Sequence, residues 1–300
     1  MGVLAERREK AEEVLQNDTT HKIYFKDSRK MKEVTSESVH LIVTSPPYWN
    51  IKDYGHPNQI GYRDSLNGYI DNLNKVWKES IRTLHPGCRL CVNIGDLYLR
   101  ATKTTPYQIV PIHAMVVNSI TNKFEESVVY LGSVIWQKIS TTKTSGGANV
   151  MGSYGRPRNG YLSLDYEYIA IFKKLGEPPK AQKEIIEESR IDLEDWRELF
   201  SGHWKFNGVT QKGHIAMFPD ELPKRLIRMF TFPWDTVLDP FLGSGTTTKA
   251  AFEMNRNSIG YEIGFDTNDG ENFKELIKNK IHYFDLPESE RDTIFSFSDY

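Results

Sequence analysis

The chain has 300 residues, with 38 Lys or Arg against 40 Asp or Glu, so its formal net charge is -2. A hydrophobic fraction of 39% beside 26% charged residues is typical of a globular chain with a large core, and it excludes a disordered one. No run of about 18 apolar residues occurs, which excludes a membrane-spanning helix, and the charged first ten residues predict no signal peptide.

Apolar runs alternate with amphipathic runs along the chain, which predicts strands alternating with helices in a parallel α/β sheet. We expect strands at 22–25, 39–44, 89–96, 128–139, 166–172, 236–239 and 258–262. We expect helices at 3–16, 65–84, 107–119, 180–198, 222–230 and 246–254, with a short helical turn after Ser28. The clearest of these is 65–84, where apolar residues recur at helical spacing before Pro86 ends the pattern.

The segment from Thr236 to Glu262 reads as strand, glycine-rich turn, helix and strand. Gly243 and Gly245 leave the backbone open to a ligand, and the helix that begins near Thr246 offers unpaired N–H groups. Glu262 ends the next strand, where an acid commonly accepts hydrogen bonds from ribose hydroxyls. The unit predicts a site for an adenosine-bearing cofactor, and a plain tight turn is the alternative.

The residues around the turn narrow the choice of cofactor. No lysine follows Gly245, which argues against a P-loop, and Thr248 occupies the third glycine position of the dinucleotide fingerprint. Asp239-Pro240-Phe241 precedes the glycines, and its carboxylate suits a cationic group such as the amino group of a methionine moiety. The sequence therefore favours S-adenosylmethionine over a pyrophosphate cofactor.

A second turn, Ser45-Pro46-Pro47-Tyr48, directly follows the apolar strand at 39–44. The two prolines fix φ and give up their N–H donors, so the Pro46 carbonyl is held as a pure acceptor. With the Ser45 hydroxyl beside it and the Tyr48 ring for stacking, the turn fits a planar ring that bears an NH2 group. When two acceptors bind the N–H groups of that amine, its lone pair points towards an electrophilic methyl group. Catalysis then consists largely of aligning the amine with the methyl group. The alternative is a proline-rich loop packed in the core.

These two blocks together resemble the DNA amino-methyltransferases of restriction–modification systems. The blocks are TSPPYW at 44–49 and DPFLGSGTT at 239–247, and their order is similar to that of the β-class of this family. The resemblance covers roughly 21–265. It implies a Rossmann-like α/β fold with a mainly parallel sheet that binds S-adenosylmethionine, and methyl transfer to a base flipped out of duplex DNA.

The resemblance also implies roles for single residues. Asp27 would contact the adenine of the cofactor, and Phe218 with Pro219 would close over its methionine end. Ser45 in the first block implies methylation of cytosine at N4, with adenine N6 as the alternative. The remaining cofactor residues would be Asp239, Pro240, Phe241, Gly243, Ser244, Gly245, Thr246, Thr247 and Glu262.

On the same basis we expect one main domain with a small insertion. Its parts are an N-terminal helix at 1–20, a catalytic half at 21–173, a target-recognition lobe at 174–212 and a cofactor half at 213–300. A regulator that binds DNA without methylating it is a competing interpretation, although both blocks are intact. An enzyme for RNA or for a protein amide is another.

Residues 137–161 contain no Asp or Glu but carry Lys138, Lys143, Arg156 and Arg158 among Gly, Ser, Thr and Asn. Because affinity for DNA comes largely from neutralised phosphates, we expect this loop to contact duplex DNA. A solvated loop is the alternative. Further expected partners are a cognate restriction endonuclease and a second copy of the chain, in the cytoplasm at the nucleoid.

The cysteines and histidines show no metal-ligand pattern. Cys88 and Cys91 form a single CxxC inside a predicted strand, where they would point to opposite faces and pack in the core. Trp196 and Trp204 are also expected to be packing residues, with contact to DNA as the alternative. We therefore expect no metal site.

Overall fold

The computed structural model describes residues 19–138, 156–208, 218–264, 272–281, 283 and 288–298. All but the last two residues of the expected helix at 1–20 lie outside this part of the chain. Within the described ranges, no helix is long and apolar enough to cross a membrane.

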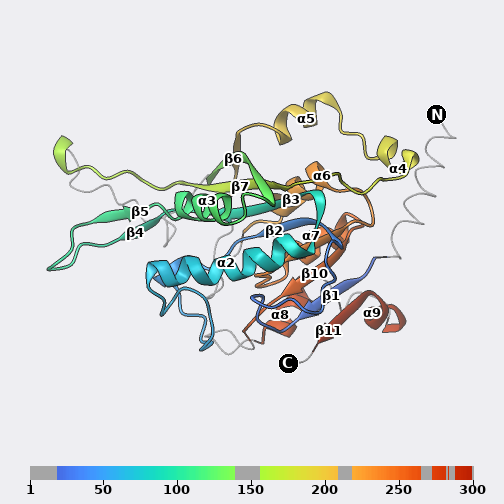
Figure 1. Cartoon of the computed structure of the whole chain (residues 1–300), viewed down its shortest axis with the longest axis horizontal. Helices are drawn as coiled ribbons and strands as arrows, with labels where there is room; N and C mark the ends of the chain where they lie inside the picture. The colour runs from blue at the N-terminus through green and yellow to red at the C-terminus, as the bar shows by residue number, and fades with distance from the viewer. Residues whose placement is uncertain are drawn as a thin grey trace.

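Nine strands form the central sheet (Figure 1). They are β1 (His21–Tyr24), β2 (Val39–Thr44), β3 (Leu84–Ile94), β6 (Val128–Lys138), β7 (Tyr166–Lys174), β8 (His203–Phe206), β9 (Thr236–Asp239), β10 (Asn257–Tyr261) and β11 (Phe295–Ser298). Their order is β11-β1-β10-β9-β2-β3-β7-β6-β8. Neighbouring strands run parallel, except that β7 is antiparallel to both β3 and β6. The predicted α/β fold with a mainly parallel sheet is confirmed.

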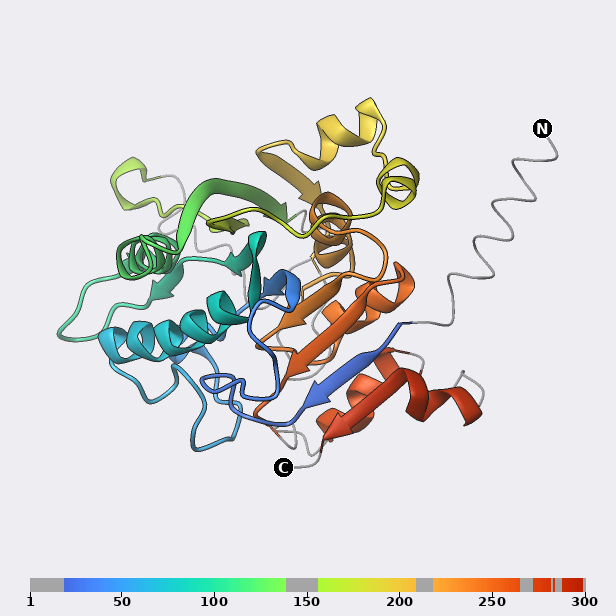
Figure 2. The same ribbon diagram turned by 45° about the vertical axis from the view of Figure 1, so that its right-hand side comes forward.

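Helices cover both faces of this sheet (Figure 2). The helices α2 (Leu66–Thr83) and α3 (Ile112–Lys123) pack on one face, and α6 (Glu221–Phe230) and α7 (Thr246–Glu253) pack on the other. Strand β2 contributes to both layers, because Ile42 joins the first cluster while Leu41 and Val43 join the second. A strand that is buried on both faces explains the continuous apolar run that the sequence shows here.

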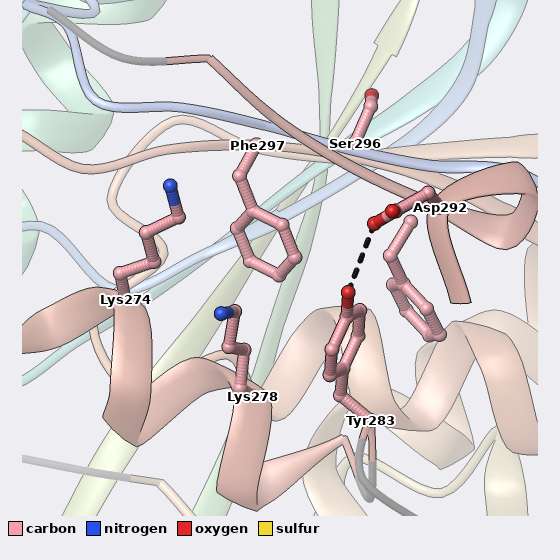
Figure 3. Close-up of a pocket in the computed structure, with 7 residues that line it drawn as sticks. Lys274, Lys278, Tyr283, Asp292, Ser296 and Phe297 are labelled. Carbon is pink, nitrogen blue, oxygen red and sulfur yellow. Dashed lines mark hydrogen bonds between the residues drawn. The ribbon is translucent and has the colours of Figure 1, made fainter. Parts of the chain in front are cut away.

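Beyond Glu262 the sequence predicts no element, but the structure adds three. These are α8 (Phe273–Lys280), α9 (Glu288–Ile294) and β11, which pairs with β1 at the margin of the sheet. Figure 3 shows Lys274 and Lys278 of α8 beside Phe297 of β11. The Tyr283 hydroxyl donates a 2.9 Å hydrogen bond to Asp292 Oδ1 across the same pocket. These contacts hold α8 and α9 against the edge strand.

Three predicted elements differ from the observed ones. Residues after Ser28 form turns rather than a helical turn, because Asp27 Oδ1 accepts the Arg29 N–H at 2.9 Å and satisfies the backbone locally. The predicted helix at 107–119 begins only with α3, since β5 (Gln108–Val110) forms a hairpin with β4 (Leu97–Leu99).

The third difference lies in the predicted helix at 180–198, which is two short helices. They are α4 (Lys183–Glu188) and α5 (Leu193–Leu199), and the Asp192 side chain caps α5 by accepting the Asp195 N–H at 2.9 Å. An N-cap between them starts a new helix rather than continuing the old one.

The cysteines lie in the core as predicted. Cys88 belongs to the cluster under α2 and α3, whereas Cys91 belongs to the cluster under α6 and α7, so they point to opposite faces of β3. Trp204 is buried as predicted, but the packing prediction for Trp196 is wrong. This residue is 49% exposed, and its ring stacks on Phe200. In the described ranges no cluster of residues could hold a metal ion.

Candidate functional site

The parallel strands bring the predicted site residues to one edge of the sheet. The predicted segments follow the carboxyl ends of β1, β2, β9 and β10, which are neighbours in the order β1-β10-β9-β2. In open α/β sheets, ligands bind outside the carboxyl ends of the strands. Asp27, the turn 45–48, the turn 239–247 and Glu262 therefore all lie at the edge where a ligand is expected.

The glycine-rich turn leaves room for a ligand. Gly243 has φ +55° and Gly245 has φ +89°, which side-chain-bearing residues rarely adopt. A Cβ atom added at Gly243 would meet no other atom within 4 Å, so open space adjoins this glycine. A Cβ atom at Gly245 would instead lie 3.2 Å from Ile277 Cγ2. The first glycine thus borders open space, and the second permits close packing under the turn.

Glu262 is anchored to the turn by its backbone contacts. Its Oε2 accepts the Gly243 N–H at 2.8 Å, and its Oε1 accepts the Gly264 N–H at 2.9 Å. Burial raises the pKa of this carboxyl, while these N–H groups act in the opposite direction. The acid is therefore fixed directly beside the open space at Gly243.

Asp239 joins the two sequence blocks. Its side chain is 1% exposed, and Thr44 Oγ1 donates to Oδ1 while Thr247 Oγ1 donates to Oδ2, each at 2.7 Å. The Phe241 N–H also donates to Oδ1 at 3.0 Å. Burial raises the pKa of this carboxyl to about 6. Because Thr44 immediately precedes Ser45, one carboxylate fixes the first block relative to the second.

The other predicted cofactor residues surround these anchors. Phe241 packs its ring edge-on to Trp77, with centroids 6.4 Å apart, and Phe218 packs against the cluster of α6 and α7. Asp27 holds Arg29 in an ion pair, with 2.5 Å between Oδ2 and Nη2. Pro240, Ser244, Thr246 and Thr247 are buried, and Pro219 is partly buried. Contact with a cofactor stays a prediction for all of them.

A hydrogen bond from helix α2 holds the Ser45–Tyr48 turn in place. Tyr69 Oη of α2 donates a 2.8 Å hydrogen bond to the Pro47 carbonyl. Next to the turn, Trp49 has φ +28°, and its Nε1 donates to the Asp64 carbonyl at 2.9 Å. Sequence patterns did not single out Tyr69 in this role, because its position on the apolar face of α2 predicts only a core residue.

Two polar residues next to this turn were missed by sequence reasoning. Asn93, near the end of β3, is 3% exposed, and its Nδ2 lies 2.8 Å from Glu167 Oε2 and 3.5 Å from Ser45 Oγ. Glu167 lies near the start of β7, has a 12% exposed side chain and pairs through Oε1 with Lys138 of β6. Each of the two is a polar residue within an otherwise apolar strand, close to the end of that strand that lies nearest the site. This pattern is the sequence signal that could have identified them.

Tyr48 lies at the centre of this group. Burial, followed by the Glu167 carboxylate, raises the pKa of Tyr48 well above its usual value. A Cβ atom at Gly95 would lie 3.4 Å from Tyr48 Cε2 and 3.1 Å from Glu167 Cγ, so the two side chains converge on one glycine. The phenol therefore stays protonated at neutral pH.

The predicted DNA-contact residues that the structure describes fall in two different environments. Lys138 is engaged by Glu167, and its Nζ also lies 5.4 Å from the centroid of the Trp136 ring. Lys143 lies outside the described residues. Arg156 and Arg158 are exposed and form no ion pair with any described residue.

The chain is similar to known DNA methylases. A family model described as DNA methylase, of the N6 and N4 type, matches residues 39–267. Type II methyltransferase M.MjaI of Methanocaldococcus jannaschii is 37% identical, with 88% of this chain and 91% of that protein covered. M.MthZI of Methanothermobacter thermautotrophicus is 36% identical, with 88% and 77% covered.

Solved structures show the same fold. TTHA0409 of Thermus thermophilus, a candidate DNA modification methylase complexed with S-adenosyl-L-methionine, is 30% identical with a TM-score of 0.68. The match covers 93% of this chain and all of that one. The cytosine-N4-specific PvuII DNA methyltransferase, at 21% identity, has a TM-score of 0.61 over 89% and 94% of the two chains, which shows a common fold. The chain belongs to the family of N6 and N4 DNA methylases.

Proposed function

We propose that this chain is a site-specific DNA methyltransferase that uses S-adenosylmethionine to methylate the N4 amine of a flipped cytosine. One observation carries the proposal: the Asp239 carboxylate ties Thr44 to Thr247 and so fixes the amine-binding turn beside the cofactor turn. The open space at Gly243, next to Glu262, supports an adenosine-bearing cofactor there. Ser45 in the first block favours cytosine, by the resemblance given above.

The roles of the chain's residues follow from their positions. When bound, the cofactor supplies a methyl group already activated by the sulfonium charge. Ser45 Oγ and the Pro46 carbonyl accept the two N–H groups of the target amine, and the Tyr48 ring stacks on the base. Tyr69 holds the Pro47 carbonyl, so this geometry exists before the base arrives. Alignment of the amine with the methyl group supplies much of the rate enhancement.

The DNA is held outside this pocket. We assign phosphate contacts to Arg156 and Arg158, because both are exposed and without acidic partners among the described residues. Lys143 belongs to the same assignment, although it lies outside the described ranges. The lobe at 174–212, which contains α4, α5 and β8, is assigned to target recognition. The proposal also includes two partners, a cognate restriction endonuclease and a second copy of the chain in a homodimer. It places the protein at the nucleoid.

The test is the chemical identity of the product. Duplex DNA methylated by the purified chain should yield N4-methylcytosine when its nucleosides are analysed by mass spectrometry. A Ser45→Ala variant should lose most of this product, whereas the matched Ser38→Ala variant, at the opposite end of β2, should retain it. Detection of N6-methyladenine alone would instead establish the adenine-N6 alternative, and the absence of any methylated base would contradict both.

A further inference from the structure

We propose that the β4–β5 hairpin, residues 97–110, forms one basic surface with residues 156–164, and that this surface holds the phosphate backbone of duplex DNA beside the methylation site. The inference rests on the proposed function, because it takes duplex DNA as the substrate. It adds Arg100 and Lys103 of the hairpin loop to the phosphate contacts and identifies the side chains that join the two segments.

The hairpin begins at the edge of the sheet that carries the proposed site. Strand β3 ends at Ile94, and β4 begins with Leu97. Asn93, one residue before the end of β3, lies with its Nδ2 3.5 Å from Ser45 Oγ. Figures 1 and 2 both show the hairpin running outward from the sheet, beyond the neighbouring end of α2. A duplex that brings a base to Ser45 therefore passes close to the hairpin.

The hairpin carries positive charge without acidic residues. Residues 97–124 contain no Asp or Glu. Arg100 and Lys103 are exposed, and neither forms an ion pair with any residue in the described part of the chain. Asp96, the acid just before the hairpin, is engaged at the start of α3, where its Oδ1 accepts the His113 N–H at 3.1 Å. Since the whole chain has a formal net charge of -2, a polyanion needs such a local concentration of basic residues.

Tyr98 joins the hairpin to residues 156–164. Its hydroxyl donates a hydrogen bond to the Leu162 carbonyl, and the same oxygen accepts the Leu164 N–H at 2.7 Å. One side chain of β4 thus binds the backbone of the second segment at two points. The two segments are distant in the sequence, but these bonds hold them side by side.

A stack of aromatic rings makes a second connection. Tyr107, at the end of the hairpin loop, packs on Tyr161 with ring centroids 4.0 Å apart and an interplanar angle of 10°. The ring of Tyr98 lies next to that of Tyr107, with 5.7 Å between centroids. The joined segments carry four exposed cations, which belong to Arg100, Lys103, Arg156 and Arg158.

The loop that presents Lys103 is ordered by its own threonines. The Thr102 N–H donates to the Thr105 carbonyl at 2.9 Å. Thr102 Oγ1 accepts the Thr104 N–H at 3.3 Å and the Thr105 N–H at 3.1 Å. Hydrogen bonds of this kind from a side chain to the nearby backbone stabilise a turn. The cation is therefore presented from a formed loop, which lowers the ordering cost of binding.

The decisive variant combines Arg100→Ala with Lys103→Ala, and the matched control combines Lys75→Ala with Lys78→Ala on α2. Each pair removes two exposed positive charges. Filter binding of duplex DNA over a salt series should show weaker binding in the hairpin pair, with a log–log salt slope flatter by roughly 1–2 units. The α2 pair should keep the wild-type slope.

A second variant tests whether the two segments form one surface. Adding Arg156→Ala and Arg158→Ala to the hairpin pair should flatten the slope by roughly 2–4 units in all, since each phosphate contact contributes about 0.9. Affinity for S-adenosylmethionine should not change, and the rate of methyl transfer at saturating DNA should match wild type. The expected effect is thus on the concentration of DNA that is needed and not on the chemical step.

Three results would overturn the inference. The first is an unaltered DNA affinity and slope in the hairpin pair, and the second is an equal loss in the α2 pair, which would reflect net charge alone. The third is unchanged DNA binding with an altered sedimentation coefficient, which would assign the hairpin to contact with a second copy of the chain. If the wild-type protein neither binds nor methylates duplex DNA, the proposed function itself fails, and that result is distinct from these three.

Discussion

The cofactor turn and the basic residues Arg156 and Arg158 lie towards the same edge of the sheet, but they are built in opposite ways. In the turn, Asp239 and Glu262 each accept at least two hydrogen bonds from the protein itself. The two arginines are exposed and have no acidic partner among the described residues. The comparison teaches that the proposed cofactor site is organised before binding, whereas the proposed DNA-contact residues keep their charges available.

The largest expected effect comes from removing the carboxylate that joins the two blocks. Asp239→Ala leaves the buried Thr44 and Thr247 hydroxyls without their acceptor, which should lower the free energy of unfolding by about 3 kcal/mol. Affinity for S-adenosylmethionine should fall by roughly 100-fold or more, as calorimetry would measure. Asp235→Ala is the control, because Asp235 precedes the opposite end of β9 and pairs with His40. Equal losses of affinity in both variants would contradict the assignment.

The same carboxyl makes stability depend on pH. The folded protein keeps the Asp239 proton up to about pH 6, whereas the unfolded chain loses it near 3.8. Its contribution to stability is therefore greatest at low pH and is lost as the pH rises through this window, by about 3 kcal/mol in total. Unfolding curves of wild type and Asp239→Asn should diverge between these pH values and run parallel above them.

A smaller effect is expected from Glu262, which touches the turn but does not join the blocks. Glu262→Ala should weaken cofactor binding by roughly 10- to 100-fold, equivalent to about 1.5–3 kcal/mol for hydrogen bonds to a charged group. Glu253→Ala removes an acid from the far end of α7 and should leave this affinity unchanged. Titration calorimetry of both variants is the measurement, and wild-type affinity in Glu262→Ala would remove Glu262 from the site.

The basic residues Arg156 and Arg158 are expected to have no effect on cofactor binding. Arg156→Ala combined with Arg158→Ala should weaken DNA binding and flatten the log–log salt slope by roughly 1–2 units. Affinity for S-adenosylmethionine should not change. Lys75→Ala combined with Lys78→Ala, on the exposed side of α2, serves as a matched control for charge. Filter binding over a salt series decides the question, since an unaltered slope would make 137–161 an ordinary solvated loop.

Sequence patterns predicted the parallel core well and the polar surroundings of the site poorly. Strands such as β2 are apolar on both faces, so a short continuous run identifies them without knowledge of their neighbours. The two blocks were recognisable because each is contiguous. Asn93, Glu167 and Lys138 come together only through the antiparallel placement of β7, and strand direction leaves no mark in a short apolar sequence. The same limit applies to α8, α9 and β11, whose order depends on packing at the sheet margin.

The reversed strand has one more consequence. Because β6 ends and β7 begins at the same edge, both ends of the segment that links them lie at the edge of the sheet that carries the proposed site. Doubling the length of such a closed loop costs only about 0.6 kcal/mol in closure entropy, and it shifts no strand. Over evolutionary time this segment can gain, lose or exchange residues while the catalytic centre keeps its geometry. Changes in its length can thus be accommodated without rebuilding the sheet.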